Sequence, residues 1–386
     1  MHDSMIVGID LAKSSFQIHQ ATKSGRVLDR LKKTRKQLPV FLAKMPKSSL
    51  FMEACASANY WARLAKSHGH EVKLIAPQYV KPFVKSQKND AADAEAICEA
   101  GTRSNMRFVP IKSVAQQDLQ SLHRIRSRYV GNRTALYNQM RAFLLENGLA
   151  VTKSMKALRT TIADIISADP NVTRGDVSEL MRGELTELLE EAQALDAKVL
   201  KYDKKMEIAV SQDERCQSLM KLPGVGPITA TAIVASVGSC GEFKNSRQFS
   251  AWLGLVPQQH STGGKTRLSG LSKRGDKYLR TLVIHGARAV LMNVGKKKDP
   301  RSQWADKLKT KVGMNKAAVA MANKNARTMW AILHRGSEYD PYYKSSSVAP
   351  EARPKRKKKS PPPANRELPN VAALDGGEGR LQTANL

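Results

Sequence analysis

Apolar residues in the first 110 positions fall into short runs that alternate with helical patterns. The runs with the length and composition of β-strands are MIVGIDLA, FQIHQAT, GRVLDRL, SLFMEAC and EVKLIAP, beginning at residues 5, 16, 25, 49 and 71. Helices are expected near 34–45, at 59–69 and at 89–101. Three early strands followed by alternating helices and strands predict a mixed α/β sheet flanked by helices, in an RNase H-like order.

From about residue 113 to 211 the strand patterns stop and helical periodicity replaces them. One seam alternates steps of three and four residues over three heptads: Leu185, Leu188, Ala192, Leu195, Val199, Tyr202 and Met206. This spacing predicts a helical, coiled-coil-like middle region. Two interpretations stay open, because the seam can pack on its own chain or join two copies into a dimer.

The segment LMKLPGVGPITATAIVASVG (219–238) has the form of a helix, a tight turn and a second helix. In a helix-hairpin-helix motif, Gly224, Gly226 and the amides at the start of the second helix meet a phosphate oxygen. The alternative is a hairpin that serves only for packing. After residue 336 the chain becomes rich in Pro, Lys and Gly, which predicts a disordered basic tail.

These patterns divide the chain into four regions. They are an α/β domain (1–112), a helical linker and dimerisation region (113–211), a mostly helical C-terminal domain (212–336) and the tail (337–386).

The net charge of the chain indicates which class of molecule it binds. The chain has 386 residues, with 64 Lys and Arg against 34 Asp and Glu, for a net charge of +30. Such an excess is typical of proteins that bind nucleic acid, although a ribosomal-type or merely solubilising charge is an alternative. No apolar run is long enough to span a membrane, and the N-terminus does not resemble a signal peptide. Four cysteines without a CxxC pair argue against a zinc ribbon or disulfide framework and favour a reducing cytoplasm.

Four carboxylates stand out in this basic chain. Asp10 and Glu53 each lie at the end of an expected strand, and Asp90 and Asp93 lie three residues apart on an expected helix. Taken singly, each is explained as a turn or helix-cap residue. Together they predict a pocket of oxygen ligands for Mg²⁺, with Mn²⁺ as the alternative.

The stretch PQQHSTGGKTRLSGLSKRG (257–275) reads as a flexible basic loop with adjacent hydroxyls, Ser261 and Thr262, at its centre. Gly263 and Gly264 would let the backbone approach a DNA strand closely. The cations expected to neutralise phosphate oxygens are Lys265, Arg267, Lys273 and Arg274.

Several motifs together resemble one known family. GIDLAK (8–13), FMEA (51–54) and NDAADA (89–94) are similar to the D-E-D-D motifs of a RuvC-like domain. LPGVGPITA, HSTGGK and SKRGDKYLR resemble the C-terminal domain of the DEDD transposases of bacterial insertion sequences. This family includes the Piv inversase, and the resemblance is to its insertion-sequence one-ten group, in the eleven-eleven branch.

The resemblance implies a DNA recombinase of the bacterial cytoplasm and nucleoid. It implies that Asp10, Glu53, Asp90 and Asp93 are the acidic tetrad, and that a C-terminal serine becomes covalently linked to DNA. It also implies a structured guide RNA that pairs with donor and target DNA. The motif register fits either Ser261 or Thr262 as the nucleophile, and we prefer Ser261 because a primary hydroxyl is less crowded.

Two other functions remain open at this stage. One is a metal-dependent nuclease or junction resolvase in which water attacks DNA. The other is an architectural nucleic-acid-binding protein with structural carboxylates. A covalent reaction on both strands of two duplexes needs several nucleophiles, so the recombinase hypothesis predicts a homodimer that assembles into a tetramer.

Overall fold

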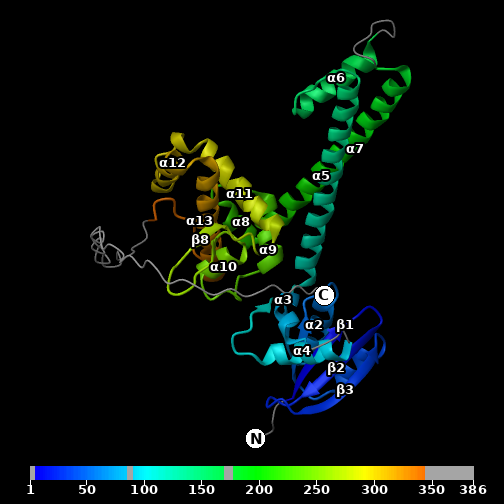
Figure 1. Ribbon diagram of the computed structural model, residues 1–386, viewed down its shortest axis with the longest axis vertical. Coiled ribbons are helices and arrows are strands. Elements are labelled where there is room, and N and C mark those ends of the chain that lie inside the picture. The colour runs from blue at the N-terminus through cyan, green and yellow to red at the C-terminus, as the bar shows by residue number, and fades with distance from the viewer. Residues whose placement is uncertain (1–4, 85–89, 169–176, 344–386) are drawn as a thin grey trace, which may run out of the picture. The chain divides into compact units, whose positions relative to one another are not determined.

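The computed structural model describes residues 5–84, 90–168 and 177–343. Its N-terminal part contains a six-stranded sheet in the order β3-β2-β1-β4-β5-β6. Figure 1 labels β1, β2 and β3 of this sheet. The strands are β1 (Ile6–Leu11), β2 (Ser15–Ala21), β3 (Val27–Thr34), β4 (Ser49–Glu53), β5 (Glu71–Ile75) and β6 (Phe108–Val109). β2 is antiparallel to β1 and β3, β4 is parallel to β1 and β5, and β6 is antiparallel to β5. The predicted mixed sheet is confirmed.

Helices cover both faces of this sheet because its central strands are apolar on both sides. On one face α1 (Gln37–Lys44) and α2 (Ala58–Ser67) pack on Val7, Ile9, Leu50 and Met52. On the other, α4 (Asp90–Thr102) packs on Ile6, Phe51 and Ile75. A short helix, α3 (Pro77–Val80), follows β5. Alternate residues of β1 and β4 therefore face opposite layers of helices.

Three helices form the middle region, and its described residues contain no strand. They are α5 (Val114–Glu146), α6 (Met155–Ser167) and α7 (Glu179–Ser211). α5 and α7 run side by side (Figure 1), and Leu185, Ala192 and Leu195 of the heptad seam are buried with residues of α5 and α6. Asp196 of α7 also accepts hydrogen bonds from Tyr137 (2.9 Å) and Arg133 (3.0 Å) of α5. The seam is thus covered by its own chain, which is the first of the two alternatives.

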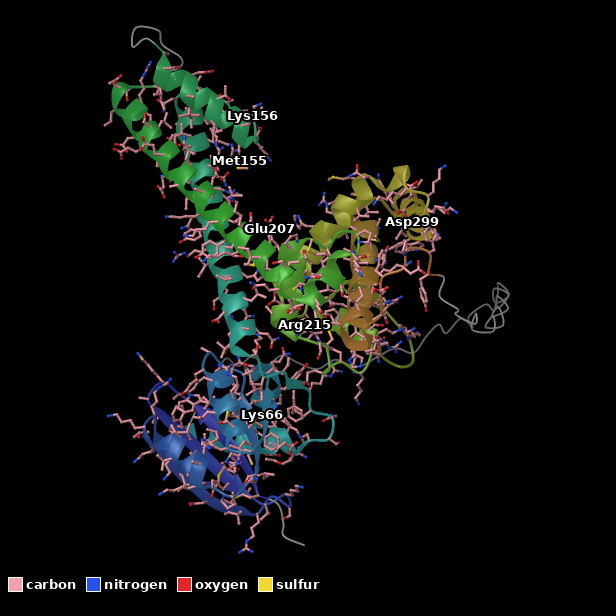
Figure 2. All side chains as sticks on the ribbon, turned by 180° about the vertical axis from the view of Figure 1, so that it is seen from behind. Lys66, Met155, Lys156, Glu207, Arg215 and Asp299 are labelled. Atoms are coloured by element: carbon pink, nitrogen blue, oxygen red, sulfur yellow. The ribbon has the colours of Figure 1, made fainter. Side chains whose placement is uncertain are left out.

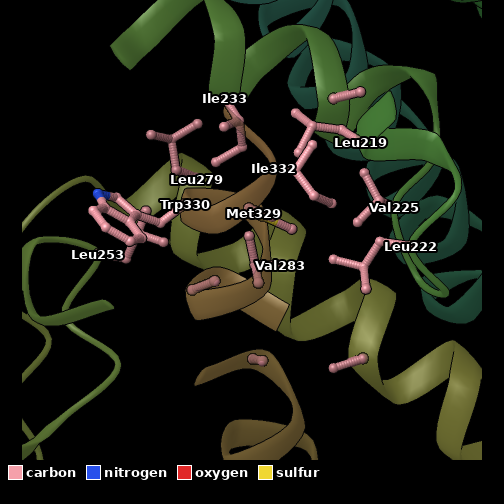
Figure 3. Packing of buried hydrophobic residues seen from close by; sticks show 14 of the residues in the cluster. Leu219, Leu222, Val225, Ile233, Leu253, Leu279, Val283, Met329, Trp330 and Ile332 are labelled. Carbon is pink, nitrogen blue, oxygen red and sulfur yellow. The ribbon is translucent and has the colours of Figure 1, made fainter. Parts of the chain in front are cut away.

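The C-terminal part is mainly helical, as expected, around one large core. Its helices are α8 (Glu214–Met220), α9 (Pro227–Val237), α10 (Ser246–Trp252), α11 (Lys277–Met292), α12 (Pro300–Val312) and α13 (Met314–Arg335). Figure 3 shows part of the core, in which Ile233, Val283 and Met329 come from α9, α11 and α13. α9 is buried along most of its length, since its sequence is apolar or small on all sides.

Acidic N-caps define where three of these helices begin, at Asp213, Asp276 and Asp299. Asp213 accepts a hydrogen bond from the backbone N–H of Arg215 at the start of α8, and its other oxygen lies 2.6 Å from that guanidinium. Asp299 accepts from Ser302 N (2.9 Å) at the start of α12. Figure 2 labels Arg215 and Asp299. Among the described residues no helix is both long and apolar enough to cross a membrane. The expected tail lies outside the described residues from position 344 onward.

Candidate active site

Two strand-end carboxylates project from one face of the sheet. A Cβ on Gly8 of β1 would lie 2.3 Å from a backbone oxygen of α4, so position 8 faces that helix. Phe51 of β4 also faces α4, because a Cβ on Gly101 would lie 2.2 Å from its ring. Side chains two positions apart in a strand share a face. Asp10 and Glu53 therefore both lie on the α4 side, near the ends of neighbouring parallel strands.

The charges of Glu53 and Asp93 interact across the junction of β4 and α4. Burial raises the pKa of Glu53, and the negative charge of Asp93 raises it further. Both side chains are half-buried. Two like charges held together in a partly desolvated position disfavour ionisation, and a bound cation would relieve their repulsion.

Asp90 is the first residue of α4, three residues before Asp93. Its side chain is outside the described part of the structure, which therefore does not place the fourth predicted carboxylate. Among the side chains that are described, no group of three or more His, Cys, Asp or Glu is arranged to hold a metal ion. The charge of Asp93 thus acts on Glu53, which shares a sheet face with Asp10, and the complete tetrad stays a prediction.

The stretch that begins at Pro257 is a β-hairpin rather than the flexible loop expected from its composition. β7 (Pro257–Gln259) pairs antiparallel with β8 (Leu268–Leu271), and a further bridge joins Thr262 to Lys265. Gly263 and Gly264 between them have φ values of +53° and +72°. Positive φ at both central residues is the requirement of a type I′ hairpin turn. The glycine pair therefore forms the tight end of a hairpin.

Ser261 and Thr262 lie on opposite faces of this hairpin. Thr262 pairs with Lys265, and the His260 N–H donates to the carbonyl of Arg267 (2.9 Å). Residues directly opposite each other share a face, and successive residues alternate. The face of Thr262 consequently carries His260, Lys265 and Arg267. Ser261 shares the other face with Gln259, whose side-chain N–H donates to its hydroxyl (2.9 Å).

Close backbone contacts fix the base of the hairpin. A Cβ on Gly275 would lie 1.9 Å from the carbonyl oxygen of Trp252, and one on Gly254 would lie 2.1 Å from that of Arg274. Both glycines have positive φ, of +99° and +73° respectively. Lys273 and Arg274 are exposed here. The four cations predicted to meet phosphate are therefore divided between the Thr262 face and the base.

The Gly-Val-Gly turn joins α8 to α9 in the expected order. Gly224 has φ of +86°, and a Cβ there would lie 2.7 Å from the carbonyl oxygen of Gly286 in α11. Gly226 precedes the first turn of α9, and a Cβ there would meet no atom within 4 Å. Gly224 thus serves close packing, whereas the space beside Gly226 is open.

Two polar residues that the sequence analysis did not single out have definite positions. Gln259 donates a hydrogen bond to Ser261. Its position two residues before Ser261 would have indicated that the two side chains share a face, had this segment been expected to be extended. His123 of α5 is buried, with one ring nitrogen 3.0 Å from the Tyr278 hydroxyl and the other 3.0 Å from the Thr231 hydroxyl. In the sequence, His123 is a polar residue directly after Leu122, among the apolar positions Leu119, Leu122 and Ile125 of α5.

Comparison with known proteins identifies the family. A model described as "Transposase IS116/IS110/IS902 family" matches residues 216–303, and a second, described as "Transposase" and named for IS110-type DEDD enzymes, matches residues 7–147. The chain is 48% identical over 336 residues to a "Probable family 20 transposase" of Pseudomonas aeruginosa, covering 87% of this chain and 98% of that protein. It is 42% identical over 339 residues to the "Transposase for insertion sequence element IS1111A" of Coxiella burnetii, covering 88% and 92%.

A more distant relative is the "Pilin gene-inverting protein" of Moraxella bovis, 21% identical over 310 residues, with 76% of this chain and 83% of that protein covered. The closer matches extend over nearly the whole of each relative. The chain therefore belongs to the IS116/IS110/IS902 family and is an insertion-sequence transposase. The family resemblance expected from the motifs is confirmed.

Proposed function

We propose that this transposase cuts and rejoins DNA strands through a covalent phosphoserine intermediate on Ser261. The observation that carries the proposal is the exposed Ser261 hydroxyl near the turn of a conformationally defined hairpin, with a hydrogen-bond donor already directed at its oxygen. A serine oxygen is a weak nucleophile at neutral pH, so attack also requires that a base take its proton or that a metal lower its pKa.

In the first step the Ser261 oxygen forms a bond to a backbone phosphorus while the bond from phosphorus to one deoxyribose oxygen breaks. The serine proton is lost to a base, and the departing sugar oxygen takes up a proton. The phosphodiester is exchanged rather than hydrolysed, so a free hydroxyl of another strand can later displace the serine. No external energy source is needed for rejoining.

The proposed metal ligands are Asp10, Glu53, Asp90 and Asp93. They come from three elements, β1, β4 and α4, and the raised pKa of Glu53 suits a site that a cation would complete. Carboxylate oxygens are the donors that Mg²⁺ and Mn²⁺ prefer. Such an ion would neutralise negative charge on the scissile phosphate. The strand order, with β1 to β3 antiparallel and β4 and β5 parallel to β1, supports a RuvC-like assignment of this domain.

Thr262 is the second candidate for the nucleophile. Its hairpin face carries Lys265 and Arg267, which would neutralise phosphate oxygens directly beside it. We retain Ser261 because its primary hydroxyl is less crowded and is the one that receives a hydrogen bond from Gln259.

We further propose that donor and target DNA and an element-encoded guide RNA are the partners, in the bacterial cytoplasm at the nucleoid. The net charge of +30 supports extensive contact with phosphates. Gly226 and the amides at the start of α9 are proposed to contact a phosphate in a helix-hairpin-helix manner, since space is open there.

Assembly of a homodimer into a tetramer is proposed because two duplexes present several strands to be cut. Since the heptad seam is covered within the chain, the surface of α7 left for another copy is its outer side. There Leu200 and Ile208 are each 56% exposed, beside Lys201, Lys204 and Lys205.

The test is a cleavage assay with the full-length protein, its element's DNA ends and the adjoining non-coding RNA. The wild type should yield protein–DNA adducts that survive denaturation, and Ser261→Ala should yield neither adduct nor cleavage. Cleavage by Ser261→Ala without any adduct would support the water-dependent nuclease instead. Unchanged recombination by Asp10→Ala on a plasmid reporter would support the architectural alternative.

A further inference from the structure

We propose that Gln259 is a positioning residue for the Ser261 nucleophile, an inference that rests on the proposed function. Gln259 Nε2 donates to Ser261 Oγ at 2.9 Å. Gln259 is the last residue of β7 and is paired across the hairpin with Leu268 of β8. Ser261 lies beyond the end of that strand, one residue before the turn segment. The ladder thus fixes the backbone of the donor, and the donor fixes the hydroxyl.

The contact determines where the serine proton and lone pairs point. A hydroxyl has one proton to donate and two lone pairs to offer. When one lone pair accepts from Gln259, the second remains for attack on phosphorus and the O–H bond is directed elsewhere. The amide does not titrate, so it holds this orientation throughout the pH range in which the enzyme works. Without it, the exposed hydroxyl would rotate among its staggered positions.

The same donor assists both halves of the exchange. Negative charge on Ser261 Oγ increases as its proton leaves before attack, and hydrogen bonding to the charged form favours that form. In the rejoining step the incoming sugar hydroxyl gives up its proton as its oxygen bonds to phosphorus, the bond from phosphorus to Oγ breaks, and Oγ takes up a proton. Gln259 then stabilises the departing oxygen. Loss of Gln259 should therefore slow both formation and resolution of the adduct.

The chain supplies a matched control one residue away. Gln258 is also a glutamine and is exposed on the same strand, but alternation directs it to the opposite face. Its side-chain oxygen accepts from Ser269 (3.4 Å) rather than from either candidate nucleophile. A general effect of shortening a glutamine on β7 would appear equally in Gln258→Ala and Gln259→Ala.

The experiment measures the single-turnover rate of adduct formation by full-length variants with DNA ends and RNA. Gln259→Ala should lower the rate about threefold to tenfold, the range expected for one lost neutral hydrogen bond. DNA affinity and the melting temperature should stay at their wild-type values, and Gln258→Ala should behave as the wild type. Equal rates for Gln258→Ala and Gln259→Ala would overturn the inference.

A second readout reports the hydrogen bond without requiring catalysis. In Ser261→Cys, a donor from Gln259 should lower the pKa of the introduced thiol, because it stabilises the thiolate. Alkylation is followed by mass spectrometry of the hairpin peptide as a function of pH. Its midpoint should lie at a higher pH in the double variant Ser261→Cys with Gln259→Ala than in Ser261→Cys alone. An unchanged alkylation profile would reject the positioning role. If Ser261→Ala still forms the adduct, the nucleophile assignment itself fails, which is a different outcome from a normal rate in Gln259→Ala.

Discussion

Glu53 at the end of β4 has a pKa that is raised by burial and then by the negative charge of Asp93 on α4, so two carboxylates far apart in the sequence repel each other on one face of the sheet. Asp10 lies on this face as well. Repulsion between carboxylates destabilises the folded state unless a cation neutralises their charge. This relation is the structural reason for proposing that the α4 side of the sheet holds a metal ion.

Glu53→Gln should stabilise the protein in the absence of divalent cations. The pKa of Glu53 is raised in the folded state, so stability is lost as the pH rises from the unfolded value of about 4.3 through the folded value. The variant should therefore melt at a higher temperature than the wild type at pH 7 in EDTA, with little difference below pH 4. Glu184→Gln, which alters an exposed carboxylate of α7, is the control. A lower melting temperature for Glu53→Gln at pH 7 would contradict the assignment.

Gly275→Ala should weaken the base of the hairpin. The new Cβ would lie 1.9 Å from the Trp252 carbonyl oxygen, and φ is +99°. We expect a loss of about 1–3 kcal/mol in the free energy of unfolding, typical of a strained backbone position, together with slower adduct formation. Gly270→Ala is the matched variant because a Cβ there meets nothing within 4 Å. Chemical denaturation measures the free energy of unfolding of both variants. Equal values for Gly275→Ala and Gly270→Ala would show that the close approach of Gly275 to Trp252 does not contribute to stability.

His123 should make the protein less stable in acid. Burial, and then the charge of Arg126, lower its pKa to about 4. The folded state thus binds fewer protons than the unfolded state below pH 6.5, and stability falls as the pH drops from about 6.5 to about 4. The contribution is about 3 kcal/mol over this interval. His123→Gln should remove this part of the pH dependence of the melting temperature, whereas His285→Gln, at an exposed position, should leave it in place.

The outer side of α7 should control association of copies. Leu200→Lys combined with Ile208→Lys should lower the molar mass found by light scattering and leave the melting temperature unchanged, because both side chains are exposed. Leu195→Lys should instead unfold the middle region, since Leu195 is buried against α5 and α6. An unchanged mass for the double variant would remove α7 from the interface.

Much of the fold was predictable from the spacing of apolar residues, because this spacing reflects which side chains are buried. The expected strands and helices of the first domain are present, and so is the long α7 with its seam. The partner of the seam could not be read from Leu185, Ala192 and Leu195 alone, since an apolar stripe packs equally well on its own chain or on another. Asp10 and Glu53 were recognisable at strand ends, and their shared face followed once the register of β1 and β4 was known.

The hairpin at 257–275 could not be predicted from amino-acid composition. Gly, Ser and Lys in 257–275 suggested flexibility, yet Gly263 and Gly264 supply the two positive φ values of one tight turn. A flexible loop would have let Ser261 and Thr262 share the same cations. The hairpin separates them, because successive residues of an extended segment alternate in direction.

The most direct test of the central claim is to map the residue that becomes linked to DNA. Full-length protein would be trapped on its element's DNA ends with the guide RNA, digested, and sequenced by mass spectrometry across the hairpin. We predict a nucleotide attached to Ser261, lost in Ser261→Ala and retained in Thr262→Ala. A nucleotide on Thr262, or an adduct that persists in Ser261→Ala, would contradict the account.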